Sequence, residues 1–182
     1  MGMRLLGMLL LVLSGSAHAA MLVAGSYTVT VEGPAEAVDI GTLELKAGDG
    51  GFSFSFALDE TRFSDQFLSM RPFKCLDGDV MVCHLAYPYE RKMWVSTEDL
   101  VDLEYEFLFI VRTPKEYGID PYNGRYFVFS VEGEEMIGRV HAVDLNLLAS
   151  PPETGNLRPL EQELLDEIEA EFERFARIRI HR

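Results

Sequence analysis

Short stretches in which apolar residues alternate with polar or small ones constrain the fold of this chain more than any other feature. In residues 27–31, 42–46 and 52–58, every second residue is an aliphatic or aromatic one. A period of two places one face of a β-strand on a core and the other face toward water. Gly33-Pro34 and the glycine-rich run 48–51 then supply turn residues. The sequence therefore predicts an antiparallel β protein.

The later stretches predict strands that are covered on both faces. Residues 66–76, 79–89, 103–112, 125–132 and 135–146 are apolar at consecutive positions for much of their length. A strand that is apolar on both faces must be buried on both faces. We therefore expect a second layer over this half of the sheet.

The C-terminal region predicts that layer as an amphipathic helix over about residues 160–176. The segment follows Pro159, a residue that suits the first turn of a helix. Acidic residues fill many of the positions between apolar ones spaced three or four apart. The apolar stripe consists of Leu160, Leu164, Ile168, Phe172 and Phe175. Residues 177–182 alternate again and are compatible with a short final strand.

These segments amount to about eight strands and one helix in a single domain over residues 20–182. Sequential antiparallel strands close naturally into an up-and-down barrel, because closure removes the unpaired edges. The predicted fold is therefore mostly β, a single antiparallel barrel with the C-terminal helix on its wall. A two-sheet β-sandwich is the alternative.

Two short motifs resemble known groups of proteins. Gly25-Ser26-Tyr27 opens the first predicted strand where lipocalins carry G-x-W, so the expected barrel resembles the lipocalin architecture. The segments R-P-F-K-C-L at 71–76, C-H at 83–84 and Y-P-Y at 87–89 resemble a group of uncharacterised proteobacterial exported proteins. That group has no assigned role. The resemblance implies a bacterial envelope protein and carries over no functional residues.

Residues 1–19 have the three-part pattern of a cleavable secretory signal peptide. The positive charge of Arg4 precedes an apolar run over 5–13, and Ala17-His18-Ala19 fits the pattern that signal peptidase reads. The apolar run is much shorter than the ~20 residues of a membrane-spanning helix. We expect the mature chain in the periplasm or outside the cell, without a transmembrane segment.

The net charge limits the classes of binding partner, and the cysteine content predicts a disulfide. The chain has 16 basic and 30 acidic residues and a net charge of −14, so nucleic acid is not an expected partner. Its two cysteines, Cys75 and Cys83, are expected to form a disulfide in an exported protein. A two-residue turn at Asp77-Gly78 would not place them opposite each other, so the hairpin requires a longer loop or a bulge.

No pattern in the sequence predicts catalysis, a metal site or a cofactor. The chain has no G-x-S-x-G, H-E-x-x-H or glycine-rich phosphate loop. The spacing of Cys75, Cys83 and His84 does not match a zinc site. His84 and His141 lie among apolar neighbours and are interpreted as wall or core residues. We therefore expect a protein that is not an enzyme.

One group of loops predicts a ligand site at a barrel mouth. Alternate connections of an up-and-down barrel share one end, so 59–66 and 90–102 are expected to lie together. They carry basic and aromatic residues in an otherwise acidic chain, namely Arg62, Phe63, Arg91, Lys92 and Trp94. This favours binding of a small apolar or amphipathic ligand with an anionic head group, because barrel mouths are common ligand sites.

The alternative function is a structural or protein-interaction module of the cell envelope. Eight strands can either pack solid or hold one small ligand, so the state of the interior separates the two functions. The long connection 113–124 is expected at the opposite end of the barrel, where it has the length of a lid or a plug.

The leader generates the first testable prediction. The exported protein should begin at Ala20, because the expected cleavage follows Ala19. Intact-mass measurement or Edman sequencing of the periplasmic species checks this. A periplasmic species that retains residues 1–19 would contradict it.

Overall fold

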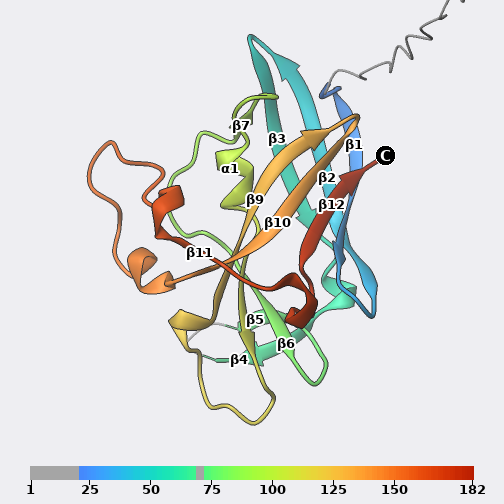
Figure 1. Cartoon of the computed structure of the whole chain (residues 1–182). Helices are drawn as coiled ribbons and strands as arrows, with labels where there is room; N and C mark the ends of the chain where they lie inside the picture. Colours follow the sequence, from blue (N-terminus) through green and yellow to red (C-terminus); the bar gives the residue numbers. More distant parts are fainter. Residues whose placement is uncertain (1–20, 69–71) are drawn as a thin grey trace, which may run out of the picture.

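Twelve strands form one antiparallel sheet in the part of the chain that the structure, a computed structural model, describes (Figure 1). The described residues are 21–68 and 72–182, and the predicted leader lies outside them. The strands are β1 (Gly25–Glu32), β2 (Ala37–Gly48), β3 (Gly51–Leu58), β4 (Ser64–Phe67), β5 (Pro72–Leu76), β6 (Met81–Leu85), β7 (Trp94–Val95), β8 (Leu108–Arg112), β9 (Gly124–Glu132), β10 (Glu135–Val143), β11 (Leu165–Glu167) and β12 (Arg177–His181). The mostly β prediction is confirmed, including the final strand.

The sheet is open, so the predicted closed barrel of about eight strands is wrong. The strand order is β4-β5-β6-β8-β9-β10-β12-β1-β2-β3-β7, and β11 pairs with β10 outside this path. β4 and β7 are therefore edges. The two-sheet sandwich is not observed either, because all twelve strands belong to one sheet. Two predicted strands also differ from the observed ones. The segment 66–76 is divided between β4 and β5, and the segment 103–112 begins within a helical turn.

The sheet does not close because its edge strands, β4 and β7, do not pair with each other, and inside the sheet β8 and β9 separate soon after they meet. Their ladder contains only two residue pairs, Phe109 with Arg125 and Ile110 with Gly124. The short helix α1 (Val101–Glu104) lies beyond the separation and contacts both β9 and β7. The opening is thus covered by a helical turn rather than by a strand.

Glu104 satisfies the backbone that β8 leaves unpaired. Its carboxylate accepts hydrogen bonds from the backbone N–H of Phe129 at 2.9 Å and from the hydroxyl of Tyr126 at 2.6 Å. A buried N–H without an acceptor would cost about 1–3 kcal/mol. The carboxylate therefore takes the place of a neighbouring strand along this part of β9.

The interior of the curled sheet is filled by its own side chains. Tyr27, Val29 and Val31 are buried on one face of β1, as the alternation predicts. Aromatic rings then meet across the interior: Phe107 lies 5.0 Å from Phe56 and 5.6 Å from Phe129 between ring centroids. The remaining buried aliphatic residues of this core include Leu43, Leu45, Leu103, Met136, Ile178 and Ile180. The interior is thus a packed core.

A second core confirms that the later strands are covered on their other face. It contains buried tyrosines and leucines from five segments, namely Tyr87, Tyr105, Tyr126, Leu145, Leu148 and Leu160. The Tyr105 hydroxyl accepts a 2.7 Å hydrogen bond from the backbone N–H of Leu160. Arg158 pairs with buried Asp102 at 2.6 Å and fixes the same covering segment to α1.

The predicted helix over 160–176 is absent. The segment consists of the 3-10 turn Gln162–Leu164, β11, and the 3-10 turn Ala170–Phe172. The predicted stripe does not form one buried face either, since Leu160 and Phe175 are buried whereas Leu164 and Phe172 are exposed.

Electrostatics explain why the helix does not form. In a helix, Glu163, Glu167 and Glu171 would lie four residues apart on one face, where like charges repel. The segment 160–173 has no lysine or arginine to compensate. In the extended form, Glu173 instead makes a two-point contact with Arg125 at 2.8 and 2.9 Å.

The buried carboxyl of Glu104 generates a pH prediction. Burial raises its pKa above the ordinary 4.5, against the opposing effect of its two hydrogen bonds. A group whose pKa is raised by folding stabilises the fold below its unfolded pKa and loses that contribution as the pH rises through the folded pKa. The free energy of unfolding of the native chain should therefore fall relative to Glu104→Gln above pH 4.5, by about 1.4 kcal/mol per unit of pKa shift.

Urea unfolding of both proteins between about pH 4 and about pH 7 measures this difference. The other acidic groups titrate in both proteins and cancel. A difference in stability that does not vary with pH would contradict the raised pKa.

Candidate functional site

The structure does not bring the five predicted rim residues together. Arg62 ends the 3-10 turn Glu60–Arg62, which follows the end of β3. Trp94 in β7 pairs with Ser53 near the beginning of β3, and its ring lies against Gly48 and Gly51 in the β2–β3 turn. Arg62 and Trp94 therefore lie at opposite ends of β3. Phe63 packs against the main core.

The basic charges of the predicted rim are also largely neutralised. Arg62 lies 3.5 Å from the carboxylate of Asp59. Arg91 pairs with Glu106 at 2.6 Å, and both side chains are only 14% exposed. Lys92 is exposed. Because a packed core lies behind these residues, they do not surround an opening into the interior.

The two strand histidines are fixed by the backbone. His84 Nε2 lies 2.8 Å from the carbonyl oxygen of Glu106, and its ring packs beside Phe56 and Phe109. Burial lowers the pKa of His84. His141 Nδ1 lies 3.0 Å from the carbonyl oxygen of Arg139. These contacts agree with the interpretation of both as wall or core residues.

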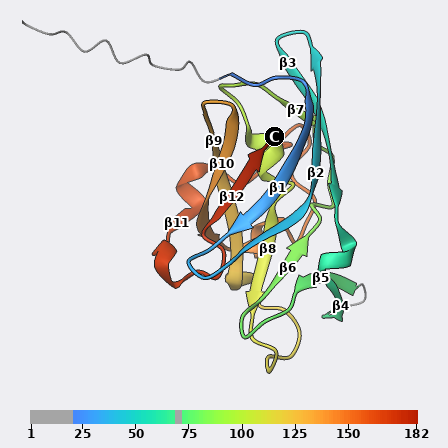
Figure 2. The ribbon, with the colours of Figure 1, turned by 90° about the vertical axis from the view of Figure 1, so that its right-hand side faces the viewer.

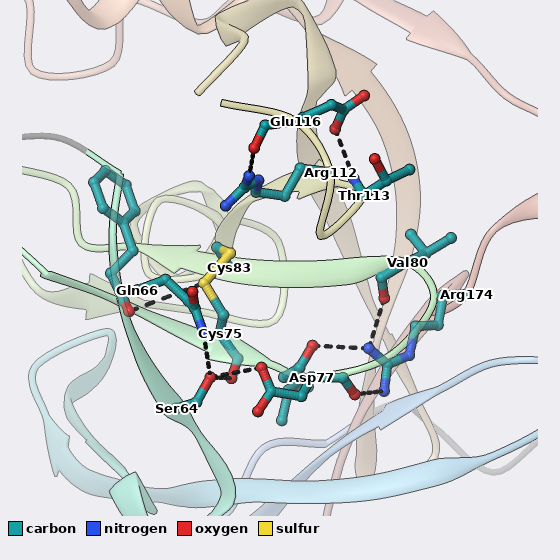
Figure 3. Close-up of a disulfide and its surroundings, with 12 residues drawn as sticks. Ser64, Gln66, Cys75, Asp77, Val80, Cys83, Arg112, Thr113, Glu116 and Arg174 are labelled. Atoms are coloured by element: carbon teal, nitrogen blue, oxygen red, sulfur yellow. Dashed lines mark hydrogen bonds between the residues drawn. A yellow bond between two sulfur atoms is a disulfide. The ribbon is translucent and has the colours of Figure 1, made fainter. Parts of the chain in front are cut away.

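The predicted disulfide is confirmed and anchors a different surface (Figure 3). Cys75 in β5 lies directly opposite Cys83 in β6, and both are fully buried. Residues 77–80 connect the two strands, so the hairpin has the longer loop that the cysteine spacing requires. The bond fixes the register of a hairpin near one edge of the sheet.

Arg174 holds this loop in place from the far end of the sequence. Its guanidinium donates hydrogen bonds to the carbonyl oxygens of Leu76, Asp77 and Val80 at 2.7–2.9 Å. It also pairs with Glu36 at 2.8 Å. A Cβ at Gly78 would lie 2.9 Å from the guanidinium, which explains glycine at that position.

The strand register places polar residues and apolar residues together on one outer face of β4, β5, β6 and β8. Residues directly opposite each other in an antiparallel pair share a face. Ser64 lies opposite Cys75, and Met81 lies opposite Arg112. Gln66 shares this face, since it is two residues from Ser64. The other face, with Leu76 and Val82, belongs to the main core.

A groove lies on this outer face between β4 and the loop that follows β8. It comprises two adjoining hollows of about 590 and about 260 Å³, which share Gln66, Arg112 and Pro114. The other lining residues are Phe67, Leu68, Asp77, Gly78, Met81, Glu116, Tyr117 and Gly118. We call this surface the outer groove. The connection 113–124, predicted as a lid or a plug, supplies one of its walls.

Arg112 is the residue of the outer groove that sequence reasoning missed. It is only 7% exposed, and its guanidinium donates to the carbonyl oxygen of Glu116. Within 21–68 and 72–182, Nε has no hydrogen-bond partner and no carboxylate lies within 4.0 Å of the side chain. Its position at the end of an apolar strand and before a long loop is common for an arginine, so the sequence alone did not distinguish it.

The comparisons with known proteins give no information about this site, so its interpretation rests on its geometry. No protein-family model, no curated protein and no solved structure matches this chain. None of the helices in the described ranges is long and apolar enough to cross a membrane.

The contacts of Arg174 generate a stability prediction. Arg174→Met keeps the stem of the side chain but leaves three loop carbonyls and Glu36 without their donor. Because charge-assisted hydrogen bonds each contribute about 1.5–3 kcal/mol and are not additive, we expect the free energy of unfolding to fall by about 2–4 kcal/mol. Urea unfolding of the disulfide-bonded protein measures it.

Arg139→Ala is the matched control. Arg139 also pairs with a carboxylate, that of Glu132 at 2.6 Å, but both side chains are about half exposed. An exposed pair contributes roughly 0–1 kcal/mol. Equal losses from the two substitutions would show that Arg174 does not hold the loop.

Proposed function

We propose that this chain is an exported protein-interaction module of the cell envelope and that it binds its partner at the outer groove. The observation that carries the proposal is the contrast between a packed interior and a hollowed outer face. The proposal gives the chain no catalytic role.

Exposed aromatic residues at the outer groove support a protein partner. Phe67 is 80% exposed at the end of β4, and Tyr117 is fully exposed in the opposite wall. Aromatic residues are enriched in protein–protein interfaces, where they act as anchors. Two of them on either side of one hollow are well placed to hold a segment of a partner.

The open edge of the sheet supports the same proposal. Among the described residues, β4 is the last strand on its side of the sheet and pairs only with β5. Figures 1 and 2 show β4, β5 and β6 together at the lower end of the molecule, away from the β2–β3 hairpin. An edge strand offers unpaired backbone groups to an added strand. The buried disulfide suits an oxidising compartment such as the periplasm.

A small amphipathic ligand is the second candidate, and the size of the larger hollow favours it. Its volume of about 590 Å³ lies within the usual ~300–1,000 Å³ of small-molecule sites. Such a ligand would bind in the outer groove rather than at the predicted rim.

Site-specific cross-linking tests the proposed function. A photoreactive phenylalanine replaces Tyr117 in one variant and Tyr122, which is also exposed but does not line the groove, in the control. After export in the source bacterium, the first variant should form one defined protein adduct and the control should not.

The adduct partner is then purified for a binding measurement. Phe67→Ser should weaken its affinity for the disulfide-bonded chain about tenfold or more, because interface aromatics often contribute over 1 kcal/mol. Adducts at neither position, or equal adducts at both, would overturn the proposal. A small molecule found by native mass spectrometry in place of a protein adduct would favour the second candidate.

A further inference from the structure

We propose that the outer groove recognises a single carboxylate carried by an extended segment of the partner protein, and that Arg112 binds this carboxylate. The inference rests on the proposed function and adds the chemistry of the partner. It is carried by a buried cation whose counter-charge is missing from the described part of the chain.

Arg112 differs from the other well-buried arginines of the structure. Arg91, Arg125 and Arg174 each lie 2.6–2.8 Å from a carboxylate oxygen. Arg112 is at least as buried, yet the only hydrogen bond that its guanidinium makes with the described residues is donated to a backbone carbonyl. Because a buried charge without a partner is costly, an incoming anion would stabilise Arg112 by supplying its missing counter-charge.

The acidic residues in the walls do not supply that anion. The Glu116 carboxylate accepts a 2.6 Å hydrogen bond from the backbone N–H of Thr113. The Asp77 carboxylate accepts one from the hydroxyl of Ser64, also at 2.6 Å. Figure 3 shows the Glu116 carboxylate bound within its own loop and the Asp77 carboxylate bound to Ser64 of β4, with Arg112 between the Glu116 loop and the disulfide. A carboxylate from outside can meet the planar guanidinium with two parallel hydrogen bonds.

The rest of the outer groove favours an extended peptide around the carboxylate. Met81, which packs on the buried disulfide, lines the smaller hollow, Phe67 and Tyr117 line the larger one, and β4 offers its edge. The chain carries a net charge of −14, so an acidic run would be repelled at long range. A single carboxylate among neutral or basic residues fits both the local cation and the overall charge.

Peptide pools of defined end chemistry test the inference on the mature, disulfide-bonded chain. Three octapeptide pools lacking other acidic residues are used: one with a free C-terminal carboxylate, one with a C-terminal amide, and one amidated with a single internal aspartate. Bound peptides are eluted and quantified by mass spectrometry. At least one carboxylate pool should be retained about tenfold more than the neutral amide pool.

This comparison needs no substitution and is therefore independent of folding. Arg112→Gln should then abolish the preference for carboxylate, whereas Arg139→Gln, on an exposed surface pair, should keep it. Circular dichroism and the mass of the intact disulfide verify that Arg112→Gln folds. If it does not fold, Tyr117→Ala in the exposed loop should lower retention of the carboxylate pool without changing the fold.

The outcomes separate the two proposals. Equal retention of all three pools, together with the protein adduct at Tyr117, would overturn the carboxylate inference and leave the interaction function standing. Absence of both the adduct and any retained peptide would overturn both. Displacement of the retained peptides by hexanoate at equal concentration would also overturn the inference, because the site would then recognise a small carboxylate without a peptide.

Discussion

The hydrogen bonds of the buried Glu104 carboxylate support the fold at the point where β8 separates from β9. Beyond two residue pairs, the backbone of β9 bonds to a side-chain carboxylate on α1 instead of a strand. The Phe129 N–H is therefore paired although β8 has already separated from β9 at this point. β5, β6 and β8 keep one face on the main core, through residues such as Leu76, Val82 and Phe109, and turn the other face outward. Their outer face is then available for the outer groove, which a closed barrel wall would not offer in this form.

The C-terminal segment compensates for the flexibility that an open sheet would otherwise allow. It pairs with β10 through β11, crosses to the loop of the disulfide hairpin through Arg174, and returns into the sheet as β12. A Cβ at Gly33 would lie 1.7 Å from the Arg174 carbonyl oxygen, so the β1–β2 turn fits closely against this segment. A helix over the same residues could not make these contacts, because they require an extended chain with side chains pointing in several directions.

The sequence predicted the local features of the fold and missed the features that depend on distant pairing. Alternation identified β1 and β3, and cysteine spacing identified both the disulfide and the need for a longer loop. The closed barrel failed because nothing local reveals that β4 and β7 remain unpaired edges. The predicted rim failed with it, since it required alternate loops to share one end. The predicted helix does not form because the repulsion among its glutamates opposes the helix that the apolar spacing favours.

Arg112 shows why the candidate site could not be found from the sequence. An arginine after Val111 and before a loop is an ordinary strand end, and such residues are usually solvated or paired on the surface. Its burial follows from the disulfide, which fixes β5 against β6, and from the return of the 113–118 loop over the same face. The positive charge of Arg112 is opposite in sign to the net charge of the protein. A binding surface of this kind attracts a partner only at short range, so recognition depends on one fitted contact rather than on long-range steering.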